Sequence, residues 1–162
     1  TSCAECFRTF ALDYELDDMK VMHTTEFLVE KGFDMGLKSN DEVTVTYHDP
    51  CRLGRQMNIY DEPRDLVGSV EGVNLVEMEH TGEDALCCGV SSMMSCNENS
   101  RALRVQRFDE VRETGADIML TSCPKCVAHF ECLKFEGDPR HDFEILDVVS
   151  FLARQIEAKK QA

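Results

Sequence analysis

Five cysteines fall along the chain as a single residue, an adjacent pair and a pair separated by two residues: Cys51, Cys87-Cys88 and Cys123-Pro124-Lys125-Cys126. We call these five cysteines the five-cysteine set. Thiolates are soft ligands for zinc and for the iron of iron–sulfur clusters, so three groups of cysteine in one chain predict a shared metal site. Adjacent cysteines rarely bind the same tetrahedral zinc ion, whereas a cluster offers them several iron atoms. The spacing therefore favours an iron–sulfur cluster, with structural zinc as the alternative.

The composition limits the class of protein. With 162 residues, of which 43% are hydrophobic, the chain is long enough for one α/β domain with an appendage. Its nine cysteines occur without a signal peptide or an apolar run of about 18 residues, which indicates a reducing, cytoplasmic location and no direct membrane insertion. The net charge of −14 disfavours nucleic-acid binding and favours partners with a basic surface.

β-Branched and apolar residues predict strands that alternate with helices. Residues 42–47, 73–78, 117–120 and 144–146 form the short alternating or apolar runs that are typical of strands. Strands that alternate with helices form a parallel sheet covered on both faces. We therefore expect an α/β fold, a parallel sheet in a three-layer arrangement with helices.

Helix signals lie between these strands. Pro63 is expected at the first position of one helix, because the N–H group that proline lacks has no partner there. An apolar stripe predicts a second helix, which ends at Gly115 and whose core-facing residues are Ala102, Val105, Phe108 and Val111. Two further helices are expected, one opened by Cys123 and one over residues 148–159.

Each part of the five-cysteine set follows a predicted strand. Cys51 follows the first strand, Cys87-Cys88 follow the second after a loop, and Cys123 follows the third directly. The carboxyl ends of parallel strands share one edge of the sheet, so we expect the five thiols to meet there. Cys123 and Cys126 also fall in the first turn of a helix, where backbone amides and the helix dipole favour thiolates. This pair alone would suit a thioredoxin-like dithiol, but the other three cysteines argue against that interpretation.

The chain contains a partial internal repeat. Residues 1–10 and 121–130 are identical at five of ten positions, including both cysteines and the final phenylalanine. After a shift of four residues, the similarity resumes between residues 21–28 and 145–152. Self-similarity of this kind indicates two copies of one structural unit.

The repeat predicts a division of the chain into two parts. Residues 1–40 are expected to be the closing part of a preceding repeat, and residues 41–162 a complete domain. Cys3 and Cys6 would then be the last two ligands of a site whose other ligands are absent from this sequence. We therefore expect them to hold no complete cluster.

The motifs around the cysteines resemble a known family. Tyr47-His48-Asp49-Pro50-Cys51-Arg52-Leu53-Gly54-Arg55, Leu86-Cys87-Cys88-Gly89 and the later Cys-x-x-Cys pair are similar to the CCG, or cysteine-rich, domain family. That family includes the catalytic iron–sulfur subunits of heterodisulfide reductases and related subunits of glycolate, lactate and glycerol-3-phosphate oxidising complexes. The resemblance covers residues 41–160 as one full repeat. It implies that the five-cysteine set binds a non-cubane [4Fe-4S] cluster.

The resemblance also implies a function. A heterodisulfide-reductase-like oxidoreductase reduces a disulfide, as part of a larger complex, with electrons that arrive one at a time. The expected partners are other redox subunits, of the ferredoxin-like, flavin or cytochrome b kind, and a small thiol or disulfide, and a partner subunit would provide any membrane association. The alternatives are an electron-relay subunit of a 2-hydroxy-acid or quinone-linked dehydrogenase, and a structural zinc module.

Two residues near the first cysteine are candidate catalytic residues. His48 precedes Cys51 by three residues and is a candidate to donate a hydrogen bond or a proton to sulfur. Arg55, like Arg52, is a candidate to attract an anionic substrate. The alternatives are an ordinary histidine at the end of a strand and solvated arginines.

The remaining cysteines and one further histidine are less informative. His129 lies one turn after Cys126 and has the same two interpretations as His48. Cys96 lies eight residues after the adjacent pair and is expected to be an ordinary buried or exposed thiol, with an approach to the cluster as the alternative. Cys132 lies on a different helical face from Cys126 and is expected in the core.

Overall fold

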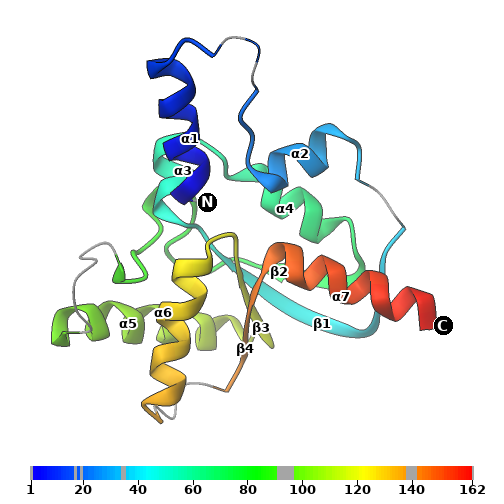
Figure 1. Ribbon diagram of the computed structural model, residues 1–162. Coiled ribbons are helices and arrows are strands. Elements are labelled where there is room, and N and C mark those ends of the chain that lie inside the picture. The colour runs from blue at the N-terminus through cyan, green and yellow to red at the C-terminus, as the bar shows by residue number, and fades with distance from the viewer. Residues whose placement is uncertain are drawn as a thin grey trace.

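Four parallel strands form one sheet in the order β2-β1-β3-β4 in the computed structural model (Figure 1). The structure describes residues 2–16, 18, 20–33, 36–90, 97–137 and 142–161, without the side chains of residues 2–4 and 158–161. The strands are β1 (Lys38–His48), β2 (Glu71–Val76), β3 (Ile118–Thr121) and β4 (Glu144–Asp147). All three pairings between neighbouring strands are parallel, which confirms the predicted sheet.

Helices connect the strands and precede them. Two helices, α3 and α4, join β1 to β2, while α5 joins β2 to β3 and α6 joins β3 to β4. Their bounds are α1 (Ser2–Asp13), α2 (Thr24–Glu30), α3 (Cys51–Met57), α4 (Asp61–Gly68), α5 (Glu98–Thr114), α6 (Pro124–Phe135) and α7 (Val148–Gln161), with a 3-10 turn, η1, at Gly82–Asp84. None of the helices in the described part of the chain is long and apolar enough to cross a membrane.

The sheet separates two hydrophobic cores, which confirms the three layers. Side chains of a strand alternate between the faces, so Leu120 packs with Phe151 of α7, on the face that α4 also covers. The neighbouring Met119 lies in the other core, with Phe108 of α5 and Phe130 of α6. All five of these side chains are at least 98% buried. The cysteines are therefore attached to a sheet that is packed on both sides.

Three predicted element boundaries are wrong by a few residues. The first strand begins four residues earlier than predicted, at Lys38. The second spans Glu71–Val76 rather than 73–78, because Glu77 leaves the sheet to pair with Arg64. Pro63 is the third residue of α4 rather than the first, a position where the N–H group also has no helical partner.

The predicted apolar face of α5 is only partly correct. Phe108 and Val111 are buried, and Gly115 ends the helix in a left-handed conformation as predicted. Ala102, however, is exposed, while the buried face includes two arginines, Arg104 and Arg107, that are both 0% exposed. The helix therefore buries charge where the pattern predicts a continuous apolar stripe.

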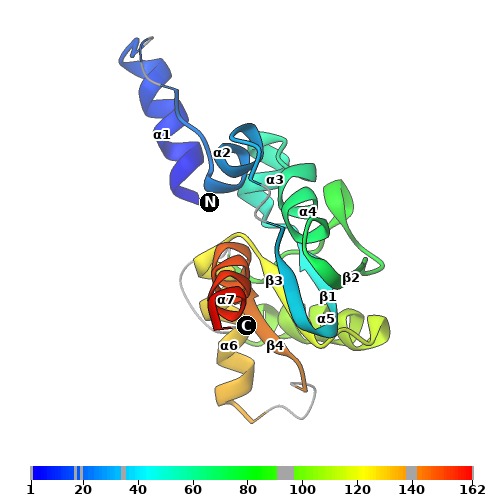
Figure 2. The ribbon, with the colours of Figure 1, turned by 90° about the vertical axis from the view of Figure 1, so that its right-hand side faces the viewer.

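The first two helices lie beside α3 and α4. Figure 2 shows α1 extending away from the sheet, and α1 contacts α3. An ion pair between Glu5 and Arg52 joins α1 to α3, and Arg8 pairs with Glu26 of α2 at 2.6 Å. The segment before β1 is thus held to the sheet domain through helix contacts.

We predict that Gly54→Ala destabilises the metal-free full chain by about 1–2 kcal/mol. Gly54 is buried in α3, and a Cβ atom there would lie 2.4 Å from Cε1 of Tyr60, so the ring must move. Denaturant unfolding measures the effect. Gly68→Ala in α4 is the control, because nothing lies within 4 Å of its Cβ position, and it should be neutral or stabilising. The predicted clash would be rejected if Gly54→Ala left the stability unchanged, or if adding Tyr60→Ala did not restore the stability lost in Gly54→Ala.

Candidate metal centre

The structure brings the side chains of the five-cysteine set together. Cys51 begins α3 shortly after β1, Cys123 lies between β3 and α6 at the position just before the helix, and Cys126 follows within the first turn. The Sγ atoms of Cys88 and Cys126 are 3.2 Å apart. The thiols of Cys51 and Cys87, of Cys87 and Cys88, and of Cys123 and Cys126 also lie close enough to interact with each other. A continuous chain of contacts therefore links all five thiols, as the order of strands and loops predicts.

The thiols differ in exposure and in acidity. Cys88, Cys123 and Cys126 are buried, whereas Cys51 and Cys87 are half-buried and form the open side. Contact with Cys87 and burial raise the pKa of Cys51. Contacts with Cys123 and Cys88, and burial, raise the pKa of Cys126 well above its usual value. Most of the set is thus protonated in the metal-free protein, so a metal must displace protons to bind.

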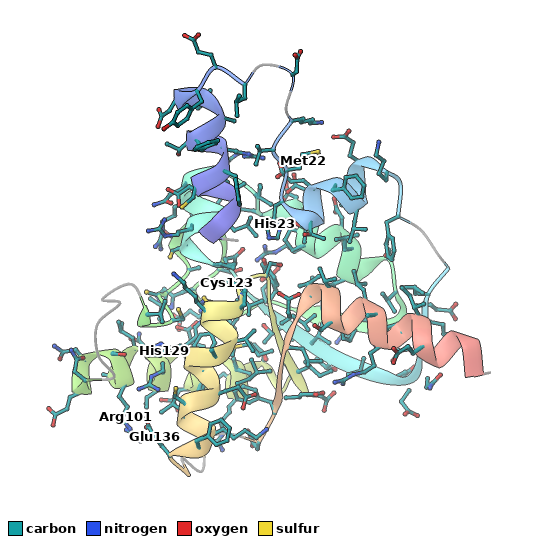
Figure 3. The ribbon with its side chains drawn as sticks, viewed as in Figure 1. Met22, His23, Arg101, Cys123, His129 and Glu136 are labelled. Atoms are coloured by element: carbon teal, nitrogen blue, oxygen red, sulfur yellow. The ribbon has the colours of Figure 1, made fainter. Side chains whose placement is uncertain are left out.

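Cys123 is the exception and is the most acidic of the set. Its hydrogen bond with Cys126, together with the backbone amides of Cys126 and Lys125, lowers the pKa of Cys123 to about 6 against the effect of burial. These amides belong to the first turn of α6, whose start is marked by Cys123 in Figure 3. The predicted effect of the helix start on this thiol is therefore present, although the neighbouring thiol contributes more.

The donor set fits an iron–sulfur cluster better than a single zinc ion. Seven cysteine side chains are described, and all seven are thiols rather than disulfides. Four thiolates complete a tetrahedral zinc site, so a fifth thiol in the same chain of contacts has no place in it. A cluster with several iron atoms can accept ligands from adjacent residues.

His48 lies against the same thiols. One of its ring nitrogens and the Sγ atoms of Cys88 and Cys126 all lie within 4.8 Å of one another. The ring is 1% exposed, and Arg107 Nε donates to its Nδ1 at 3.1 Å. Burial and the charge of Arg107 lower the pKa of His48 to about 3. At neutral pH His48 is therefore an uncharged hydrogen-bond donor, and its catalytic role stays a prediction.

The two arginines of the first motif contact protein groups. Arg55 Nη2 donates to the carbonyl oxygen of Ala85 at 2.6 Å, and its Nε donates to that of Glu83 at 3.3 Å. Arg52 pairs with Glu5 of α1. Arg55 thus holds the loop that leads to Cys87, and substrate binding by Arg55 stays a prediction.

Asp49 organises the same loop, and sequence reasoning did not identify it. Its carboxylate accepts two hydrogen bonds from Arg64, at 2.8 and 2.9 Å, and one from the backbone N–H of Gly82 at 2.8 Å. Although burial opposes ionisation, these donors hold the pKa of Asp49 below its usual value. The one sequence signal is its position directly before Pro50-Cys51.

His129 fixes the turn that carries Cys88. The Nδ1 atom of His129 donates to the carbonyl oxygen of Cys88 at 2.7 Å, and its Nε2 lies 3.1 Å from Oγ of Ser100. Gly89 follows with a φ of +84°, and a Cβ atom there would lie 2.7 Å from the carbonyl oxygen of Ser100. Figure 3 shows His129 on α6, further along the helix than Cys123. His129 therefore holds the turn that carries Cys88 against helices α5 and α6.

The other cysteines lie apart from this arrangement or outside the described residues. Cys132 is half-buried and its thiol donates to the carbonyl oxygen of Ala128, so the expectation of a core position is wrong. Leu133, the next residue, occupies the core instead. Cys6 is exposed on α1. Cys96 and the side chain of Cys3 lie outside the part that the structure describes.

A cavity of about 590 Å³ lies beside the first turn of α6. Three helix starts form its walls, contributing His23, Thr24, Ser122, Pro124, Val127, Ala128, Asp147, Val149 and Ser150. Ser122 and Pro124 flank Cys123 in the chain, so the cavity reaches the backbone that carries this thiol.

A parallel α/β domain that gathers thiols from three loops at the carboxyl edge of its sheet belongs to the class of cysteine-ligated metal domains. Residues 45–131 match the family model CCG, described as a cysteine-rich domain. The chain belongs to this CCG family. The match contains Cys51, Cys87-Cys88 and Cys123-x-x-Cys126 and thus the whole five-cysteine set.

Several named proteins are similar to the chain. It is 33% identical to a subunit of the dihydromethanophenazine:CoB–CoM heterodisulfide reductase from Methanosarcina acetivorans, over 96% of this chain and 40% of that protein. It is 31% identical to a subunit of the fumarate reductase (CoM/CoB) from Methanothermobacter marburgensis, over 94% of this chain and 31% of that protein. It is 30% identical to the probable iron-sulfur-binding oxidoreductase FadF of Bacillus subtilis, over 85% of this chain and 20% of that protein. The chain thus spans less than half of each relative, and the names give no support to a structural zinc module.

We predict that Gly89→Ala abolishes cluster assembly in the full chain. The new Cβ atom would strain a left-handed residue and collide with the backbone of Ser100, which moves the adjacent Cys88 away from Cys126. Iron and sulfide content after anaerobic reconstitution measures the effect.

Gly82→Ala is the matched control for Gly89→Ala. Gly82 also has a positive φ, of +61°, but nothing lies within 4 Å of its Cβ position. It should lose about 1–2 kcal/mol of stability to backbone strain and keep its full iron content. Equal iron content in the two variants would contradict the positioning role of the Gly89 turn.

Proposed function

We propose that residues 41–162 bind a non-cubane [4Fe-4S] cluster through the five-cysteine set and form the disulfide-reducing domain of a heterodisulfide-reductase-like oxidoreductase. The contact chain that joins Cys51, Cys87, Cys88, Cys126 and Cys123 is the observation that carries this proposal. Similarity to a heterodisulfide reductase subunit and to iron–sulfur oxidoreductases supports it.

The proposed reaction consumes two electrons and two protons for each disulfide and releases two thiols. The bound cluster supplies one-electron redox chemistry. Other redox subunits, of the ferredoxin-like, flavin or cytochrome b class, supply the electrons. His48 places an uncharged N–H donor near the sulfur atoms, which would stabilise negative charge on sulfur. The two protons then come from solvent rather than from a histidinium ion.

Two places suit the small thiol or disulfide. Cys51 and Cys87 are the least buried ligands of the set, so the cluster would be open on their side. The cavity beside Ser122 offers a mainly apolar space next to the first turn of α6. A substrate on the side of Cys51 would also lie near Arg55, whose Nη2 donates to the carbonyl of Ala85.

An electron relay without disulfide chemistry is the second candidate function. The similarity to a fumarate reductase subunit favours an electron relay, because that protein is named for the reduction of fumarate. The two candidates share the same cluster ligands and differ in whether a thiol reaches the cluster.

We further propose that residues 1–40 are the closing part of a preceding repeat. Helix α1 occupies the position in the repeat that α6 occupies in the complete domain, and α2 corresponds to α7. Phe10, which aligns with Phe130, is 47% exposed, whereas Phe130 is 0% exposed. The exposed ring is what a core residue of an incomplete unit would show.

A thiol-binding cluster gives a direct spectroscopic test of the disulfide function. We predict that the reconstituted full chain, oxidised with a candidate thiol, gives a paramagnetic signal that broadens when the thiol carries sulfur-33. Electron paramagnetic resonance measures the line width, with the sulfur-32 thiol as control. Cys88→Ser should remove the distinctive signal. If the spectrum is that of an ordinary four-cysteine cubane cluster and does not change with any thiol, the reductase proposal is rejected in favour of the electron relay.

The repeat predicts that the amino-terminal pair is dispensable for the cluster. We expect Cys3→Ser with Cys6→Ser to leave iron per chain unchanged after reconstitution, because three of five ligands are lacking there. The matched control is Cys123→Ser with Cys126→Ser, the equivalent pair in the complete domain, which should lose the cluster. Loss of about half the iron in the first variant would show a second complete site and reject the division at residue 40.

A further inference from the structure

The most unusual residue near the five-cysteine set is a buried arginine that sequence patterning assigned to no function. Arg107 lies on α5 and is 0% exposed. Its Nε donates to Nδ1 of His48 at 3.1 Å, and its Nη1 donates to the carbonyl of His80 at 2.7 Å and to Glu110 at 2.5 Å. Its Nη2 has no hydrogen-bond partner among the described residues. A buried cation is thus in contact with the histidine that lies against the thiols.

The ion pair with Glu110 does not account for all of these contacts. Glu110 is 5% exposed and also bonds Nδ1 of His80 at 2.9 Å, so it fixes Nη1 of Arg107 at one end. The Nε atom, at a different edge of the planar guanidinium group, is directed at His48. Arg104, one turn earlier and equally buried, instead contacts the carbonyl oxygens of Ser100 and His129. Burial on α5 therefore does not by itself lead to a contact with His48.

The contact with Arg107 determines where the proton of His48 lies. A guanidinium group has five N–H donors and no acceptor, so Nδ1 of His48 must present its lone pair. A neutral imidazole then carries its proton on Nε2. One ring nitrogen of His48 and the Sγ atoms of Cys88 and Cys126 all lie within 4.8 Å of one another. The Nδ1 atom of His48 accepts a hydrogen bond from Nε of Arg107.

We propose that Arg107 is a positioning residue that holds His48 as the Nε2–H tautomer, directs this N–H at the sulfur atoms of Cys88 and Cys126, and raises the reduction potential of the cluster. The inference rests on the proposed cluster ligands. Hydrogen bonds to thiolate sulfur favour the reduced, more negative cluster.

The tautomer is testable in the full chain before any cluster is loaded. In protein with nitrogen-15 histidine, His48→Gln identifies the His48 signals, and their chemical shifts report which nitrogen carries the proton. The proposal expects protonated Nε2 and unprotonated Nδ1 in the unaltered chain. A proton on Nδ1, or a charged ring at pH 7, overturns it without any further variant.

Variants then test whether Arg107 causes the tautomer. Arg107→Met combined with Glu110→Gln removes the donor without leaving a buried carboxylate unpaired, and should give a mixture of tautomers. Glu110→Gln alone is the control and should keep Nε2–H, as should Arg107→Lys, which is also only a donor. Retention of a pure Nε2–H tautomer in the double variant overturns the assignment.

The reduction potential tests the consequence for the cluster. The double variant should shift the one-electron equilibrium toward the oxidised cluster by about tenfold, which is about 59 mV, with iron content unchanged. Arg104→Met is the control for loss of another buried arginine on α5 and should shift the potential less. When His48→Gln is also present, the double variant should shift the reduction potential by a smaller amount, because Arg107 acts on the cluster through His48. A full iron content with an unchanged potential rejects the proposal for Arg107, whereas failure of the unaltered chain to bind iron rejects the proposed cluster.

Discussion

The register between β1 and β3 is the constraint on which the metal centre depends. His48 pairs with Thr121 at the end of the two strands, so Cys51 and Cys123 leave the same edge of the sheet within a few residues of that pair. A shift of β1 by one residue relative to β3 would turn every side chain of the shifted strand to the other face of the sheet. It would also move Cys51 and Cys123 apart. The buried cores on both faces hold this register, because Leu120 and Met119 are fully packed on opposite sides.

The adjacent pair of cysteines is not placed by the sheet. Strand β2 ends at Val76, well before Cys87-Cys88, and the intervening loop is positioned by polar contacts instead. Asp49 binds the middle of this loop through Gly82, Arg55 holds the segment before Cys87, and α6 contacts the carbonyl of Cys88 through its histidine, His129. Hydrogen bonds to charged groups are directional and strong where they are buried, which makes them suitable to fix a loop without regular structure.

The sequence was sufficient for the features that follow from periodicity and chain order. Alternating strands and helices predicted the parallel sheet, and the position of each cysteine after a strand predicted their meeting at one edge. It was insufficient for buried polar groups, because a hydrophobic pattern assigns Ala102 to the core of α5 and gives no reason to bury Arg107. The placement of Cys132 failed for a related reason: Cys132 and Leu133 are both apolar neighbours, and only packing decides which one enters the core.

The central claim is that five thiols from three segments bind one iron–sulfur cluster. Anaerobic crystals of the cluster-loaded full chain, measured on both sides of the iron absorption edge, test it most directly. The account predicts one compact group of iron peaks within bonding distance of the Sγ atoms of Cys51, Cys87, Cys88, Cys123 and Cys126. Iron bound by only four of these thiols, iron at Cys3 and Cys6 instead, or a single zinc peak at the centre would contradict it.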